Sequence, residues 1–243
     1  MKHKKIIIAL SVVLSVLALI MGAFFIYVGT YYKADMEAIA AFNYSGFATR
    51  EIDDGTIAYV PTQEFDTGII FYPGGKVEYK AYIPLMQSLA SRGVLCILVD
   101  MPFNLAVFDI NRADGAYEGF VMVDHWYMAG HSLGGSMACE YINNRQDFFE
   151  GVILLGSYST VDLSKTDLRA LSIYGSADMI LNKESYSENK KNLPKGLVEY
   201  IIPGGNHAYF GTYGEQGGDG KATITNAEQV NLTTEQIINF ISQ

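Results

Sequence analysis

The chain has 243 residues, of which 49% are hydrophobic and 18% are charged, and its formal net charge is −9. This length suffices for one full hydrophobic core, and the low charge content with many apolar residues excludes a disordered chain. An acidic surface repels phosphates, so nucleic acid is excluded as a partner.

The N-terminus carries the first predicted element. Three lysines lie within residues 1–5, and an uncharged stretch runs from Ile6 to Tyr32. As a helix with a rise of about 1.5 Å per residue, this stretch would reach roughly 40 Å, more than the ~30 Å hydrocarbon core of a bilayer. We therefore expect a cytoplasmic tail at residues 1–5, a single transmembrane anchor at residues 6–32 that contacts the lipid bilayer, and an extracytoplasmic remainder.

Two other interpretations of this stretch are open. A basic start followed by an apolar run is also how secretory signal peptides begin, and cleavage would make the protein secreted. The run is long for a signal peptide, and no clear Ala-x-Ala cleavage site follows it. A buried helix of a soluble protein is the third interpretation, but a helix that is apolar on all sides at a chain end would need a dedicated cavity.

Beyond the anchor we expect a juxtamembrane linker at residues 33–50, with a short helix or linker between Asp35 and Asn43, and one catalytic domain at residues 51–243. In that domain, apolar runs of strand length alternate with helical or turn-rich segments, which is typical of βαβ units. A helix is expected at Ala81–Arg92, ended by Gly93. The expected strands are Thr56–Val60, Thr67–Tyr72, Val94–Val99, Trp126–Ala129, Gly151–Leu155, Leu168–Tyr174 and Leu197–Ile202.

Short, continuously apolar strands of this kind predict a mostly parallel central sheet with helices on both faces, an α/β fold. Between two of these strands, residues 156–167 are too few for a helical cap domain. We therefore expect an open site with no large cap.

The run Gly130-His131-Ser132-Leu133-Gly134 lies between an expected strand and a helix start that is rich in small residues. A Gly-x-Ser-x-Gly turn in this position is typical of a nucleophile elbow, in which a strained backbone presents the serine above the sheet. The two glycines are needed because strand and helix pack closely there. The pattern predicts Ser132 as a nucleophile and the Leu133 N–H as a donor to an oxyanion.

A serine hydroxyl needs a base, and the base needs an acid that orients it. In this fold the chain order is serine, acid, histidine, and Asp178 and His207 both follow expected strands after Ser132. Both lie where parallel strands end, at the same sheet edge as Ser132. We predict His207 as the base and Asp178 as its partner, with Asp162 as the second choice for the acid. Of the other histidines, we expect His3 in the tail, His125 at the opposite edge and His131 pointing into the fold.

A further glycine pair, Gly74-Gly75, ends the strand before the Ala81 helix, where the second oxyanion N–H should arise. The glycines allow a close approach of the backbone to a substrate. The sequence favours the N–H of Gly75 or of Lys76 and leaves the choice between them open.

Together, these motifs resemble the α/β-hydrolase superfamily, and more narrowly the alpha/beta hydrolase fold-5 family related to dienelactone hydrolase. The resemblance covers about Asp53 to Gln243 and implies a triad of Ser132, Asp178 and His207. Dienelactone hydrolases proper use cysteine where this chain has Ser132, so their lactone substrate is not expected to carry over. The motifs that carry the resemblance are Tyr72-Pro73-Gly74-Gly75-Lys76-Val77, Met101-Pro102-Phe103-Asn104-Leu105-Ala106, Gly130-His131-Ser132-Leu133-Gly134-Gly135, Tyr174-Gly175-Ser176-Ala177-Asp178 and Gly204-Gly205-Asn206-His207.

The leading expectation is hydrolysis of a carboxylic ester, small or envelope-associated, through an acyl-enzyme. Acyl transfer by the same triad and a non-catalytic, membrane-tethered binding module are the alternatives. No cofactor is expected, and no metal either, because the acidic part of the loop at residues 209–220 has too few carboxylates for calcium. Cys96 and Cys139 are expected to be free core thiols. The oligomeric state is left open.

Overall fold

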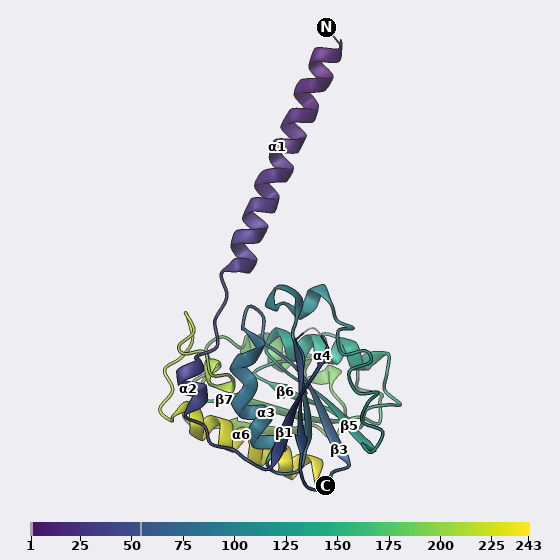
Figure 1. Ribbon diagram of the computed structural model, residues 1–243, viewed down its shortest axis with the longest axis vertical. Helices are drawn as coiled ribbons and strands as arrows, with labels where there is room; N and C mark the ends of the chain where they lie inside the picture. Colours follow the sequence, from purple (N-terminus) through teal and green to yellow (C-terminus); the bar gives the residue numbers. More distant parts are fainter. Residues whose placement is uncertain (1, 54) are drawn as a thin grey trace. The chain divides into compact units, whose positions relative to one another are not determined.

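A computed structural model describes residues 2–53 and 55–243 of the chain (Figure 1). The chain divides into two compact units, one that ends at Tyr31 and one that spans Tyr32–Gln243. The first unit consists of one helix, and the second contains the entire sheet.

The helix of the first unit, α1 (Lys2–Gly29), is the one helix among the described residues that is long and apolar enough to cross a membrane. The mean hydropathy of its most apolar 18-residue window is 2.8, and that window is not buried. A signal sequence near an N-terminus also meets this criterion of length and composition, so membrane anchor and signal peptide both remain compatible with α1.

The second unit is built on one eight-stranded sheet with the order β1-β2-β4-β3-β5-β6-β7-β8. β1 and β2 pair antiparallel, β2 runs antiparallel to β4, and every other neighbouring pair is parallel. The mostly parallel sheet expected from the sequence is thus confirmed. The strands are β1 (Phe47–Asp53), β2 (Thr56–Pro61), β3 (Thr67–Tyr72), β4 (Leu95–Leu98), β5 (His125–His131), β6 (Gly151–Leu155), β7 (Arg169–Gly175) and β8 (Val198–Ile202).

Strand β1 lies partly in the segment that we expected to be a linker, residues 33–50. The sequence of β1 is polar and charged at Thr49, Arg50 and Glu51, and it pairs only with β2 at the edge of the sheet. An edge strand buries little, so it lacks the continuous apolar run by which the inner strands are recognised. The linker is therefore folded into the second unit, and within it the expected short helix is α2 (Met36–Ala40).

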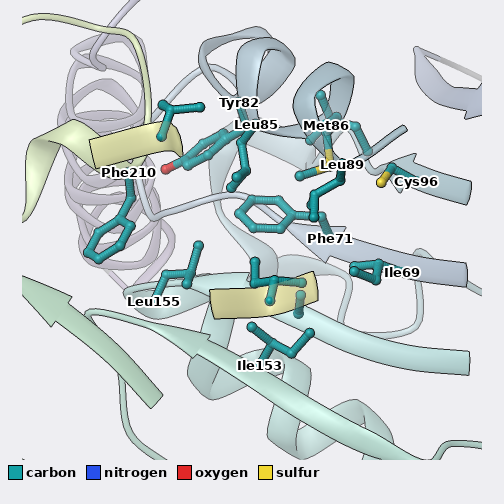
Figure 2. Close-up of a cluster of buried hydrophobic side chains, with 14 of the residues drawn as sticks. Ile69, Phe71, Tyr82, Leu85, Met86, Leu89, Cys96, Ile153, Leu155 and Phe210 are labelled. Atoms are coloured by element: carbon teal, nitrogen blue, oxygen red, sulfur yellow. The ribbon is translucent and has the colours of Figure 1, made fainter. Parts of the chain in front are cut away.

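Helices cover both faces of the sheet, because successive side chains of each strand point to opposite faces. On β3, Ile69 and Phe71 belong to one buried cluster and Ile70 and Tyr72 to the other. Figure 2 shows the first cluster, in which Phe71 lies against side chains of α3. The helices of the second unit are α2, α3 (Ile83–Ala90), α4 (Leu133–Asn143), α5 (Lys183–Asn189) and α6 (Asn226–Ile241).

Helices α3 and α6 pack against each other on the face of the first cluster, and α4 contributes Cys139 and Tyr141 to the second. Helix α3 is shorter than the expected 81–92 because a 3₁₀ turn at Tyr79–Tyr82 precedes it. Gly93, at φ +92°, follows it and ends it as expected. Cys96 and Cys139 are both buried and free.

Candidate active site

The nucleophile elbow joins β5 to α4. Ser132 lies between them with φ +51° and ψ −123°, a backbone conformation that costs a non-glycine residue about 1–3 kcal/mol. Its own N–H donates to Leu155 O at 2.9 Å, which holds the turn against β6. As the first helical residue, Leu133 presents an N–H that has no partner within α4.

Close packing explains the glycines of the elbow. A Cβ on Gly134 would lie 2.2 Å from Pro73 O, and a Cβ on Gly130 would lie 2.6 Å from Gly134 C. Both distances are far inside van der Waals contact, so only glycine fits at either position. The sequence-based reason for these glycines, the close approach of strand and helix, is therefore confirmed.

His207 and Asp178 meet in the interior at the carboxyl ends of β7 and β8. His207 Nδ1 lies 2.9 Å from Asp178 Oδ2, and both side chains are buried. The other carboxylate oxygen, Oδ1, accepts the N–H groups of Ile180 at 2.9 Å and Leu181 at 2.8 Å. The carboxylate is thus held on both sides and can orient the imidazole. Asp162, the second choice for the acid, is exposed and accepts the N–H of Ser164 instead.

Ser132 and His207 line the same pocket, which has a volume of about 240 Å³. Ser157 in its wall donates its hydroxyl to Ser132 O at 2.6 Å, and Ser136 donates to Tyr158 O at 2.8 Å. The sequence did not predict that these residues line the pocket, because no motif assigns a role to their hydroxyls. The remaining lining residues are Leu133, Gly156, Ile180, Leu181 and Asn182.

Larger hollows exist elsewhere on the second unit. One of about 610 Å³ is lined by residues 62–66 and Met122, near the amino ends of the strands. It contains neither a histidine nor a serine, whereas the smaller pocket brings a strained serine beside a carboxylate-bound histidine. The chemistry of the lining, and not the volume, therefore selects the pocket at Ser132 as the candidate site.

Gly156, directly after β6, is a residue of the site that sequence reasoning missed. Its φ is +53°, and a Cβ there would lie 2.9 Å from His207 Nδ1 and 3.2 Å from Asp178 Oδ2. Any side chain would press on the histidine–carboxylate pair. A glycine at the end of a buried strand, in a chain with this elbow, is the only signal that could have pointed to it.

The loop after β3 has one N–H already occupied. Lys76, at φ +60°, donates its backbone N–H to Asn104 O at 2.7 Å. The N–H of Gly75 has no acceptor among the described residues, and a Cβ on Gly75 would lie 2.8 Å from Leu133 Cδ2. Of the two candidates that the sequence left open, Gly75 therefore has the available donor and lies beside Leu133.

Asp219, in the loop at residues 209–220, ties together the two loops that carry Asp178 and His207. Its Oδ2 accepts the N–H of Ala208 at 2.9 Å, and its Oδ1 accepts the N–H of Met179 at 3.2 Å. None of the residues 209–220 lines the pocket at Ser132. This loop therefore holds the two loops that carry the histidine–carboxylate pair and does not line the pocket itself.

His131 lies behind the pair and points into the fold, as expected. Its Nδ1 is 2.7 Å from Tyr82 Oη, which accepts the N–H of Gly74 at 3.0 Å, and its ring centroid is 4.4 Å from that of His207. Burial lowers the pKa of His131 well below its usual value, and the neighbouring His207 lowers it further. His131 is therefore neutral in the folded protein at neutral pH.

We predict that this buried histidine makes the domain less stable in acid. The unfolded chain binds a proton at His131 below about pH 6.5 and the folded chain does not, so stability falls as the pH drops through that value. Between pH 7 and pH 5, His131 should lower the free energy of unfolding by about 2 kcal/mol, and His131→Gln should abolish this part of the pH dependence. Urea unfolding followed by fluorescence of Trp126, the single tryptophan, measures this.

His125→Gln is the control for this experiment. His125 is exposed, and a hydrogen bond to Glu150 raises its pKa. Its contribution to the stability of the fold is therefore present at low pH and is lost as the pH rises. Removing it should leave the loss of stability in acid intact. If the free energy of unfolding had the same pH dependence in the wild type and in His131→Gln, the prediction would be contradicted.

Comparison with known proteins identifies the family of this chain. A family model described as the alpha/beta hydrolase family matches residues 68–231, two thirds of the chain, and the chain belongs to this family. The resemblance seen in its motifs is thereby confirmed, and the family supports a hydrolase. A search of curated protein sequences found no match.

Two solved structures have the same fold. Est1E from Butyrivibrio proteoclasticus superposes with a TM-score of 0.58 at 16% identity, covering 82% of this chain and 100% of that one. A dienelactone hydrolase from Anabaena variabilis ATCC 29413 superposes with a TM-score of 0.60 at 15% identity, covering 81% of this chain and 99% of that one. At such identities the likeness establishes the α/β-hydrolase fold and leaves the substrate to be argued from the site.

Proposed function

We propose that the protein is a serine hydrolase that cleaves a carboxylic ester through an acyl-enzyme, with Ser132 as nucleophile, His207 as base and Asp178 as the acid that orients it. The observation that carries the proposal is the buried contact of 2.9 Å between His207 Nδ1 and Asp178 Oδ2, with the same histidine lining the pocket of Ser132. A structural histidine would not need both a carboxylate partner and a place beside a strained serine.

The reaction begins when Ser132 Oγ attacks the ester carbonyl carbon. His207 Nε2 takes the hydroxyl proton, while Nδ1 keeps its own proton in the hydrogen bond to Asp178. His207 then gives the proton to the leaving alcohol, whose C–O bond breaks. Water, deprotonated by the same imidazole, then attacks the acyl carbon. His207 returns this proton to Ser132 Oγ as the acyl C–Oγ bond breaks and the acid is released.

The negative charge that develops on the carbonyl oxygen needs donors that are in place beforehand. We assign this role to the N–H groups of Leu133 and Gly75, two residues in close contact, since a Cβ on Gly75 would lie 2.8 Å from Leu133 Cδ2. The N–H of Lys76 is bound to Asn104 O and positions the loop instead. Each such donor contributes about 10²–10³-fold to the rate.

We further propose that α1 is an uncleaved anchor, with the N-terminus cytoplasmic and the second unit outside. Its length and hydropathy support this, and the lysines at its start set the orientation. Protease added to intact cells should digest the second unit, and alkaline carbonate should leave the chain in the membrane fraction. Release of a shortened chain into the medium would mean that α1 is cleaved.

The hydrolase is tested by labelling the folded full-length chain with a fluorophosphonate. This probe phosphonylates only an activated serine, so we expect one adduct, which mass spectrometry should map to Ser132. An acyl ester of short chain length should be hydrolysed and should compete with the labelling. Absence of labelling in folded protein would overturn the proposal and revive a non-catalytic binding module.

A further inference from the structure

Three apolar side chains are exposed on the turns that follow β4. Phe103, Val107 and Phe108 are each between 46% and 49% exposed, and the rings of Phe103 and Phe108 lie 5.6 Å apart. We call these three side chains the apolar rim. Exposed apolar side chains that gather in one patch are typical of a surface that contacts a membrane, another protein or a ligand.

The apolar rim is fixed beside the candidate active site. Asn104, next to Phe103, accepts the Lys76 N–H at 2.7 Å, and Leu105 Cδ2 lies 3.5 Å from where a Cβ on Gly75 would be. Phe103 and Asn104 are both at φ +56°, a region that side-chain-bearing residues rarely adopt. The strained turn that carries Phe103 is thus bound to the loop of Gly75, and backbone strain of this kind is more readily explained by function than by folding.

The chain that leaves α1 reaches the second unit at this same place. The N–H of Tyr32 donates to Lys76 O at 2.8 Å, and Tyr32 O accepts the N–H of Glu78 at 2.9 Å. The next residues are bound as well, since the N–H of Ala34 donates to Glu78 Oε2 at 3.0 Å. The attachment point is thus part of the loop that carries Gly75 and Lys76.

Only a short piece of chain separates this attachment point from the end of α1. From Gly29 to Tyr32 there are three steps along the chain, which extend to about 10 Å at most. If α1 lies in a bilayer, this tether keeps the loop that carries Gly75 close to the membrane surface.

We propose that the apolar rim inserts into the outer leaflet of the bilayer that holds α1, and that the substrate is the carboxylic ester of a molecule held in that bilayer by its acyl chain. The ester then reaches Ser132 from the membrane without passing through water. Half-exposed aromatic and branched side chains next to the site gain free energy when they leave water for the interface. This inference rests on the proposed serine hydrolase and on the proposed anchor.

Insertion of the rim is measured without reference to activity. The full-length chain is reconstituted in phosphatidylcholine vesicles, and Val107→Cys is labelled with a polarity-sensitive fluorophore. Val121→Cys is the matched control, because Val121 is 88% exposed but precedes β5 at the amino ends of the strands. The two native cysteines are buried, and the wild type measures their background labelling.

We expect a spin label carried on the lipid acyl chains to quench the fluorophore at position 107 by at least twofold, and to leave the one at position 121 unchanged. Equal quenching at the two positions, or none at position 107, would overturn the insertion of the rim.

The substrate class is tested with a double variant and its matched control. Val107→Ser/Phe108→Ser removes most of the rim, whereas Val121→Ser/Met122→Ser removes two exposed apolar side chains elsewhere. Each is assayed in the vesicles on a long-chain acyl ester embedded in the bilayer and on a short-chain ester in water. The rim variant should lose about tenfold on the embedded ester and less than twofold on the soluble one, and the control should lose neither.

The outcomes separate this inference from the proposed function. If the wild type reacts with the fluorophosphonate and cleaves only the soluble ester, the hydrolase stands and the membrane-held substrate is wrong. If the rim variant loses both activities equally, or neither, the rim has no role in reaching the substrate. If the wild type neither reacts with the probe nor cleaves either ester, the proposed function fails and this inference fails with it.

Discussion

Replacing Ser132 by alanine is expected to lower kcat/KM for an acyl ester by roughly 10⁵- to 10⁶-fold and to abolish fluorophosphonate labelling. Alanine lacks the Oγ that forms the acyl bond, and no other hydroxyl in the pocket replaces it. The two other serines that line the pocket, Ser157 and Ser136, donate their hydroxyls to carbonyl oxygens. Steady-state hydrolysis of a chromogenic ester measures the loss.

The same position offers a control that separates chemistry from folding. At φ +51° and ψ −123°, alanine keeps the strain of Ser132, whereas glycine relieves it. Ser132→Ala should therefore unfold close to the wild type, and Ser132→Gly should be more stable by about 1 kcal/mol, both without activity. A Ser132→Ala variant that keeps a tenth of the wild-type rate would rule out Ser132 as the nucleophile.

Much of the fold could be predicted because the central strands are continuously apolar. Seven strands and the helix that follows β3 were expected within a few residues of where they lie, since a parallel sheet covered on both faces leaves that pattern in the sequence. The edge strand β1 leaves no such pattern. Its pairing with β2 is a property of the folded sheet, and the expected linker was misplaced for that reason.

In the candidate site, too, some residues could be predicted from the sequence and others could not. Ser132, Asp178 and His207 each follow a strand, so topology alone predicts that they lie at one sheet edge. Gly156 leaves room for the His207 and Asp178 side chains, and Asp219 accepts a hydrogen bond from the N–H of Ala208. Neither role belongs to a recognisable sequence motif.

The choice between Gly75 and Lys76 depended on a third residue. Asn104, nearly thirty positions further along, accepts the Lys76 N–H and leaves that of Gly75 available. Hydrogen bonds between loops far apart in the chain are set by tertiary structure, so the sequence could only name both candidates.

The second large effect is expected from Asp178→Asn, which should lower kcat by about 10⁴-fold with little change in KM. Asp178 uses both oxygens as acceptors, Oδ1 for the N–H groups of Ile180 and Leu181 and Oδ2 for His207 Nδ1–H. An asparagine has only one oxygen. If that oxygen keeps the two backbone N–H groups, the amide NH₂ faces His207 Nδ1, which must then accept, and the proton moves to Nε2.

With the proton on Nε2, the imidazole cannot take the hydroxyl proton of Ser132, and the base is lost although every residue stays in place. Asp162→Asn is the matched control, because Asp162 is an exposed aspartate whose carboxylate caps Ser164 and does not lie at His207. It should change kcat less than twofold. Equal losses in the two variants, or a loss below tenfold in Asp178→Asn, would remove Asp178 from the mechanism. The tautomer itself can be read from the ¹⁵N shifts of the His207 ring, which should exchange their pattern between Nδ1 and Nε2 in the asparagine variant.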